Sequence, residues 1–316
     1  MEWYYIVLIA LSSIIGLCFL TSLICFLTTF YARKRKPLKE GEFRLIKGKI
    51  YQEYYPVMIE WMKQNRALPK TEMCIRSYDG LKLYGTYFEC EKGAPVEILF
   101  NGYRGEPERD MSGAVERCFA LRHNVILACQ RACGKSDGKV ITFGVRESKD
   151  CVSWIEHAIK VFGDDVELII GGVSMGGSTV LMAGANKLPK NVKYILSDCA
   201  FSSAKSVIKK VVKQMHLPAS VFYPFIKLGA RLFGGFNLEE KPPIEAVENI
   251  SIPVIFFHGD TDDFVPFYMA QELYQKCKAP KKFLAVKDAG HGLAFPKAKE
   301  EYLNAIREFE KENNIW

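Results

Sequence analysis

The sequence predicts an α/β fold, in which helices cover both faces of a mostly parallel sheet, preceded by one transmembrane helix. Three observations support this prediction. From residue 96 onward, short aliphatic runs alternate with longer helical patterns, which is typical of strand–helix–strand units. An alternating stretch before them predicts a hairpin at the antiparallel edge of the sheet. Residues 3–32 contain no charged side chain.

The uncharged stretch is long enough to cross a membrane. As a helix it would extend about 45 Å, and a bilayer core needs about 30 Å. A cleaved signal peptide would have a basic start, a shorter apolar run and a small-residue cleavage site. Here only Met1 and Glu2 precede the run, which ends in Phe30 and Tyr31. We therefore expect residues 1–36 to be a retained, single-pass anchor.

Basic residues lie on only one side of this predicted anchor. The cluster consists of Arg33, Lys34, Arg35, Lys36 and Lys39. By the positive-inside rule, the large C-terminal part is expected in the cytoplasm. The same cluster can contact anionic lipids, and it supplies much of the net charge of +7. No basic stripe interleaved with aromatic residues occurs elsewhere, so we expect no nucleic-acid partner.

The ten cysteines are scattered along the chain and show no short paired spacing of a disulfide framework or zinc site. Cys129 and Cys133 are the closest pair outside the anchor, but they lack neighbouring ligands. Free thiols suit a reducing compartment, and no metal site is expected.

The elements follow in a regular order. Residues 37–70 form a connector with a weak helical pattern that Pro56 interrupts, and a hairpin follows around Asp79 and Gly80. Strands are predicted at residues 96–100, 125–129, 166–170, 192–196, 254–257 and 282–286. Helices are predicted at residues 111–122, 147–161, 176–186, 268–276 and 297–313. Residues 203–250 contain no strand pattern; they are helical, apolar and basic, are interrupted by Pro218 and Pro224, and are expected to form a cap.

The motif Gly172-Val173-Ser174-Met175-Gly176 lies between a predicted strand and a predicted helix. G-x-S-x-G in this context is typical of a nucleophile elbow, in which a strained turn exposes the serine at the top of the sheet. The alternative is a glycine-rich turn without catalytic function. Ser178, one helical turn further on, is expected to be a packing residue.

A nucleophilic serine needs a base, and the base needs a carboxylate that orients it. His291 follows the last predicted strand, and we expect it to be the base. The other four histidines are expected to be structural or exposed: His123, His157, His216 and His258. The spacing leaves four candidate acids: Asp198, Asp260, Asp262 and Asp263. For the oxyanion hole we expect the backbone N–H groups of Met175 and Tyr103.

Several motifs together give the chain a family resemblance: "SYDGLKLYG", "NGYRG", "CQRACGKSDGKVITFG", "GVSMGG", "SDCAFSS", "HGDTDDFVP" and the final Gly290-His291. The chain resembles serine hydrolases of the α/β-hydrolase superfamily, of the serine aminopeptidase and acylglycerol-lipase-like type. The resemblance implies an α/β-hydrolase fold over residues 71–316, with Asp262 as the triad acid and His258 as a strand-end histidine. It implies no cofactor.

The sequence departs from the pattern of this family at two places. Asn101 stands where many members have histidine, and Cys129 and Cys133 stand in a segment that commonly reads Asp-x-Arg-Gly-His-Gly-x-Ser. No member of the expected triad is lost. Both departures lie where they can alter the oxyanion loop and the pocket wall.

The expected activity is cleavage of carboxylic esters, small or lipid-like, by Ser174, Asp262 and His291 through an acyl-enzyme. The first alternative is an aminopeptidase-like serine peptidase, which needs acidic groups to hold an amine; the cap offers Glu239, Glu240, Glu245 and Glu248. The second is a catalytically silent binding module of the same fold. Because the cap is apolar and the anchor is near in sequence, we also expect the cap to open toward the bilayer.

Overall fold

The computed structural model describes residues 2–36 and 38–316, whose strands form one eight-stranded sheet in the order β1-β2-β4-β3-β5-β6-β7-β8. The strands are β1 Thr71–Arg76, β2 Lys82–Phe88, β3 Val96–Phe100, β4 Asn124–Ala128, β5 Leu168–Val173, β6 Val192–Asp198, β7 Val254–Gly259 and β8 Lys281–Val286. β2 runs antiparallel to both β1 and β4, and all other pairs are parallel. Each predicted strand overlaps an observed one, and the predicted α/β fold is confirmed.

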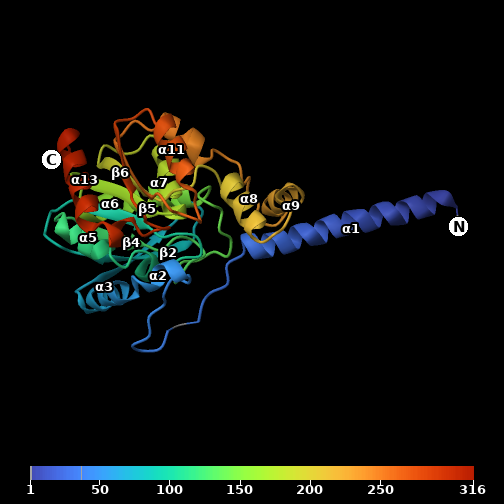
Figure 1. Cartoon of the computed structure of the whole chain (residues 1–316), viewed down its shortest axis with the longest axis horizontal. Coiled ribbons are helices and arrows are strands. Elements are labelled where there is room, and N and C mark those ends of the chain that lie inside the picture. Colours follow the sequence, from blue (N-terminus) through green and yellow to red (C-terminus); the bar gives the residue numbers. More distant parts are fainter. Residues whose placement is uncertain (1, 37) are drawn as a thin grey trace.

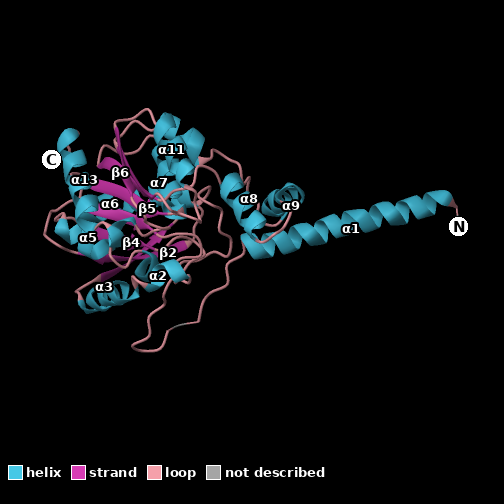
Figure 2. Ribbon diagram, viewed as in Figure 1, coloured by secondary structure: helices cyan, strands magenta, loops and turns pink. Residues whose placement is uncertain are grey.

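Helices cover both faces of the sheet (Figures 1 and 2). The main helices of the α/β domain are α3 Tyr55–Ala67, α5 Ala114–Ala120, α6 Glu147–Phe162, α7 Met175–Gly184, α11 Phe267–Lys276 and α13 Lys299–Glu312. Alternate residues of β3 point to opposite faces of the sheet. Ile98 packs in a cluster with residues of α6 and α7, and Leu99 packs in a cluster with residues of α5. Burial on both faces is why the central strands read as continuous aliphatic runs.

Short helices complete the domain and refine the predicted bounds. They are α2 Lys49–Gln52, α4 Pro107–Asp110 and α12 Ala294–Lys297. Pro56 lies in the first turn of α3 rather than interrupting a helix, because the missing N–H of a proline costs nothing there. The helix expected at residues 111–122 is the shorter α5, and the one expected at 297–313 is divided between α12 and α13.

Residues 203–250 form helices that lie outside the sheet; the first two, α8 and α9, lie beside the C-terminal end of α1 (Figure 1), and the last two pack on α7 and α11. They are α8 Ala204–Gln214, α9 Ala219–Leu232, α10 Pro243–Ala246 and the single turn η1 Val247–Asn249. Pro218 precedes the first residue of α9. Pro224, expected to interrupt the segment, lies inside a continuous α9, where the packing of Tyr223 and Ile226 holds the helix together.

α1 Trp3–Thr29 is a single helix that is long and apolar enough to cross a membrane. Most of it projects away from the α/β domain, but its C-terminal end packs on α9 (Figure 1). A Cβ at Gly229 of α9 would lie 2.5 Å from the backbone oxygen of Ser22, so the two helix backbones touch at a glycine. Phe30, directly after α1, is fully buried. The expected boundary between anchor and connector at residue 37 lies outside the described residues.

Candidate active site

Ser174 occupies a strained turn between β5 and α7. Its backbone has φ 57° and ψ −118°, a left-handed conformation that costs free energy for any residue but glycine. A Cβ at Gly172 would lie 2.4 Å from the backbone carbon of Gly176, and one at Gly176 would lie 2.0 Å from the backbone oxygen of Phe100. Both glycines are therefore required by close backbone contacts, as expected of a nucleophile elbow.

The structure brings three of the predicted residues together in a hydrogen-bonded chain. Ser174 Oγ lies 2.9 Å from His291 Nε2, and His291 Nδ1 lies 2.6 Å from Asp262 Oδ2. Asp262 follows β7 and His291 follows β8, so both lie in loops at the carboxyl edge of the sheet. The geometry is that of a serine nucleophile, a general base and an orienting carboxylate.

The other candidate acids have different partners. Asp198 Oδ2 accepts a hydrogen bond of 3.1 Å from Tyr302. Asp260 Oδ1 accepts one from the backbone N–H of Asp288, at 2.6 Å. Among the described residues, only Asp262 has a carboxylate oxygen hydrogen-bonded to His291.

Several N–H groups surround the carboxylate of Asp262. Its Oδ1 accepts hydrogen bonds of 2.8 Å from the backbone N–H groups of Phe264 and Val265, and His258 Nε2 lies 3.3 Å from its Oδ2. Burial opposes ionisation, but the histidine partners His258 and His291 outweigh it and hold the pKa of Asp262 well below its usual range. Sequence reasoning placed His258 only as a strand-end histidine; its spacing of four residues from Asp262 was the available signal.

The predicted oxyanion donors lie on two elements beside the nucleophile. Met175 is the first residue of α7, and Tyr103 lies in the loop after β3. A Cβ at Gly102 would lie 3.5 Å from the Cβ of Ser174, so this loop passes directly beside the serine. The backbone N–H groups of Met175 and Tyr103 form no hydrogen bond within the part of the chain that the structure describes. They remain available to a substrate oxygen.

The unusual residues Asn101, Cys129 and Cys133 contact one another beneath the oxyanion loop. Asn101 Oδ1 accepts a hydrogen bond from the backbone N–H of Gln130 at 3.2 Å, and its Nδ2 lies 3.8 Å from Cys133 Sγ. Cys129 Sγ donates to the backbone oxygen of Cys133 at 3.0 Å. The three residues that depart from the family pattern are therefore held in one buried set of contacts.

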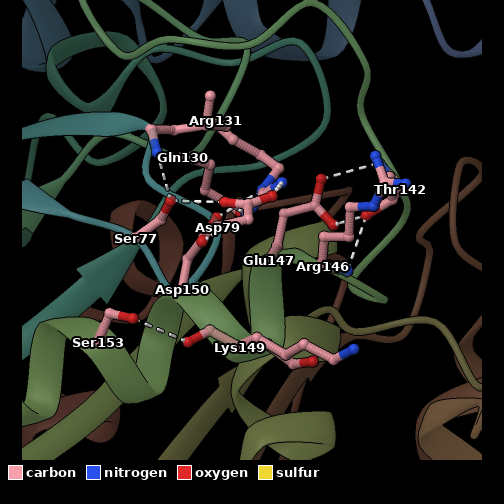
Figure 3. A network of polar contacts seen from close by, with 12 residues as sticks. Ser77, Asp79, Gln130, Arg131, Thr142, Arg146, Glu147, Lys149, Asp150 and Ser153 are labelled. Atoms are coloured by element: carbon pink, nitrogen blue, oxygen red, sulfur yellow. Dashed lines mark hydrogen bonds and ion pairs between the residues drawn. The ribbon is translucent and has the colours of Figure 1, made fainter. Parts of the chain in front are cut away.

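A buried ionic network stabilises the loop at residues 130–146, and sequence reasoning did not identify it. Figure 3 shows Arg131, Asp79 and Asp150 converging, with bonds of 2.6 Å from Arg131 to both oxygens of Asp150. Nearby, Glu147 accepts hydrogen bonds from Thr142 and from the backbone N–H of Gly144. The network holds Phe143 of this loop against the cavity described next, although the backbone φ of Phe143 is 55°.

Two cavities meet at Ser174, and they differ in character. The larger, about 440 Å³, is lined by apolar side chains of α1, α8 and α9. The smaller, about 240 Å³, is the more polar of the two and is called the polar cavity: its lining combines apolar side chains with Lys47, Arg109 and Asp110. Tyr103, Ser174 and Phe264 line both. A scissile bond at Ser174 would thus have an apolar group on one side and a polar group on the other.

Cys199, Asp262 and His291 place three potential ligand atoms within 4.8 Å of one another. These residues do not fit a metal site well. Burial raises the pKa of the Cys199 thiol well above its usual value, so it stays protonated, and both other residues are engaged in the hydrogen-bonded chain.

A family comparison places this arrangement among known proteins. The model of the prolyl oligopeptidase family matches residues 142–314. The chain belongs to this family. The matched segment contains Ser174, Asp262 and His291, and the fold is that of an α/β-hydrolase; α1 and the Tyr103 loop lie outside the match.

Proteins related by sequence come from several organisms. Uncharacterized protein YqkD of Bacillus subtilis is 27% identical over 191 residues, which are 60% of this chain and 62% of that one. Uncharacterized protein Rv2307c of Mycobacterium tuberculosis is 24% identical, over 83% of this chain and 87% of its own.

Among solved structures, the Pyrococcus furiosus esterase Pf2001 superimposes with a TM-score of 0.65 and 20% identity, covering 89% of this chain and 98% of its own. Est1E from Butyrivibrio proteoclasticus with bound ferulic acid superimposes with a TM-score of 0.59 and 19% identity. This match covers 77% of this chain and 100% of Est1E. At this identity the likeness establishes the shared fold.

Proposed function

We propose that this prolyl oligopeptidase family member is a membrane-anchored serine hydrolase that cleaves carboxylic esters of lipid-like acids. One observation carries the proposal: the hydrogen-bonded chain of Ser174, His291 and Asp262 lies where an apolar and a polar cavity meet. An acyl chain fits the apolar side, and an alcohol or water fits the polar side.

The proposed reaction has two halves. His291 Nε2 takes the proton of Ser174 while Oγ attacks the acyl carbon, and the N–H groups of Met175 and Tyr103 stabilise the oxyanion. His291 then gives the proton to the leaving alcohol as the ester bond breaks. A water attacks the acyl-enzyme in the same way and releases the acid, restoring Ser174. Asp262 keeps Nδ1 protonated and stabilises the imidazolium.

Ester cleavage is favoured over an aminopeptidase activity by the charge around the site. An aminopeptidase needs an unpaired acidic group near the nucleophile to hold the substrate amine. The cap residue Glu239 is instead bonded to Lys227 and Tyr223, and Asp110 in the polar cavity is paired with Arg109 at 2.6 Å. The family match itself keeps amide cleavage as the second candidate.

Retention of the anchor is supported by its packing. Cys25, Phe26 and Phe30 are buried against the α8–α9 segment and the loop that carries Phe143, so cleavage after α1 would remove part of the hydrophobic core. The basic residues that follow α1 favour a cytoplasmic position for the α/β domain.

A fluorophosphonate probe tests the nucleophile in the full-length protein. We expect labelling of the wild type and none of Ser174→Ala with unchanged thermal unfolding; equal labelling of both, or of neither, would support the silent binding module. Acyl p-nitrophenyl esters and amino-acid p-nitroanilides then separate the two enzymatic functions. Faster turnover of the anilides would replace esterase by peptidase.

A further inference from the structure

The exposure of α1 divides the helix into two parts. Nearly all side chains from residue 3 to residue 21 are exposed, whereas Ser22, Cys25, Phe26 and the following Phe30 are buried in the protein. Nineteen residues of helix extend about 28 Å, close to the roughly 30 Å of a bilayer core. The exposed part is thus long enough to span the membrane alone, and the buried part lies at the membrane surface.

The end of α1 is joined to the loop that carries the proposed oxyanion donor. The hydroxyl of Tyr103 donates a hydrogen bond of 2.5 Å to the backbone oxygen of Thr29. Arg104 Nη2 donates to the backbone oxygens of Thr28 and Tyr31, at 2.8 and 3.0 Å. A cation at a helix C-terminus satisfies terminal carbonyls and interacts favourably with the helix dipole. The last turns of α1 are therefore part of the site's framework.

The same turns form a wall of the apolar cavity. Ile24, Cys25, Thr28 and Thr29 line it on one side, and Val207, Ile208, Val211 and Val212 of α8 with Phe222 and Ile226 of α9 line the others. Ser174 lies at the inner end and is only 7% exposed. A chain bound here would contact α1 directly.

The outer end of the cavity is open between α1 and the turn that joins α8 to α9. At this end of the cavity the apolar side chains Ile24, Met215 and Leu217 are exposed to solvent, by 53%, 63% and 37%. Further exposed apolar side chains continue from this opening along α9, at Val221, Leu228 and Leu232. Because α1 leaves the domain beside this surface (Figure 1), the apolar residues around the opening face the bilayer that α1 would cross.

We propose that the last two turns of α1 are the chain-length-determining wall of the acyl pocket, and that long-chain acyl lipids enter this pocket directly from the bilayer. This inference rests on the proposed function for the chemistry of the ester. It assigns to α1 a role beyond anchoring, because the helix supplies side chains that contact substrate. The polar cavity on the other side of Ser174 would hold the alcohol portion.

The first test changes the wall in full-length protein reconstituted in phospholipid nanodiscs. Thr28→Trp adds a large side chain to the cavity, while Leu20→Trp makes the same addition on the exposed part of α1. We expect Thr28→Trp to lower the ratio of p-nitrophenyl palmitate to p-nitrophenyl butyrate hydrolysis at least tenfold, and Leu20→Trp to leave it unchanged. Equal loss of both rates in Thr28→Trp, or an unchanged ratio, would overturn the inference.

The second test is independent of catalysis, so it separates failure of the inference from failure of the proposed function. Ser174→Ala in nanodiscs is irradiated with a palmitic acid that carries a terminal diazirine, and the labelled peptides are mapped. Crosslinks on residues 24–29 and 207–217, competed by unlabelled palmitate, support the pocket even if no ester is cleaved. Crosslinks confined to residues 3–21, or none, would overturn it.

Discussion

At the scale of single residues, two buried aspartates near His291 illustrate how surroundings decide function. Asp262 is held ionised by two backbone N–H donors, by its hydrogen bond with His291 and by the nearby ring of His258. Asp198 has one donor, Tyr302, and its Oδ1 has no partner among the described groups; burial raises its pKa to about 6. Only Asp262 is hydrogen-bonded to His291, so only its carboxylate is placed to stabilise an imidazolium there.

This difference predicts unequal effects of two conservative substitutions. Asp262→Asn should reduce kcat roughly a thousand- to ten-thousandfold, because an amide cannot stabilise the imidazolium and favours the wrong histidine tautomer. Asp198→Asn should keep kcat within about threefold, since Asp198 makes no hydrogen bond to His291. Ester hydrolysis by both purified variants checks this. A larger loss in Asp198→Asn would make Asp198 the acid.

The buried Asp198 also predicts a pH dependence of stability. Its pKa is raised in the folded state, so between about pH 4 and pH 6 the folded protein binds more protons than the unfolded chain, and stability falls as pH rises. Asp198→Asn removes this contribution, while Tyr302 can still donate to the amide oxygen. The wild type should lose up to about 3 kcal/mol relative to the variant over that range. Chemical unfolding of both proteins at about pH 4 and pH 6 measures their free energies of unfolding. An equal change of this free energy in the wild type and in the variant would contradict the prediction.

At the scale of elements, the contact between α1 and α9 depends on a glycine that allows two backbones to touch. Phe19 and Phe26 of α1 pack around Phe233, with ring centroids 5.1 and 5.7 Å away. Gly229 lies at the point of closest approach, where any side chain would meet Ser22. The interface thus combines close backbone packing with aromatic contacts, as in associations of membrane helices.

Adding one methyl group tests this interface. Gly229→Ala should lower stability by about 1–3 kcal/mol, because the Cβ would lie 2.5 Å from the backbone oxygen of Ser22 and the helices must separate. Gly16→Ala is the matched control, since a Cβ there meets nothing within 4 Å. Thermal unfolding in nanodiscs compares them, and a midpoint in Gly229→Ala no lower than in the control would contradict the contact.

At the scale of the whole molecule, α1 is both a projecting helix and part of the core. Phe30 packs edge-on against Phe143 and Phe236, which joins the end of α1 to the loop beside Ser174. The backbone continues this connection, because the N–H of Ile141 donates to the oxygen of Phe30. The C-terminal end of α1 and the α/β domain are therefore expected to unfold together.

Two truncations separate these roles. Removing residues 2–21 should release the protein from membranes yet preserve cooperative unfolding and fluorophosphonate labelling, because the buried turns remain. Removing residues 2–31 should abolish both cooperative unfolding and labelling, because it leaves the sites of Phe26 and Phe30 in the hydrophobic core empty. Sedimentation with vesicles and calorimetry provide the readouts. Normal folding and labelling of the shorter protein would show that α1 is a simple tether.

The fold was predictable because its signals are local. Aliphatic runs, turns and the G-x-S-x-G motif each depend on a few neighbouring residues, and the carboxyl ends of parallel strands necessarily meet at one edge. The limits of helices were less predictable. Pro56 and Pro224 were expected to interrupt helices. Pro56 instead lies in the first turn of α3, and Pro224 is accommodated inside α9 by tertiary packing.

By itself, the sequence determined the α/β architecture, the apolar helix of membrane-spanning length and the residues proposed as nucleophile and base, because each rests on spacing along the chain. Spacing left four candidate acids, and the choice of Asp262 among them came from the family resemblance. Only the tertiary structure decided what lies around them. The Arg131 network and the cavity that residues 24–29 line together with α8 and α9 join residues from separate elements. Such contacts arise from how finished elements pack, and no local pattern encodes them.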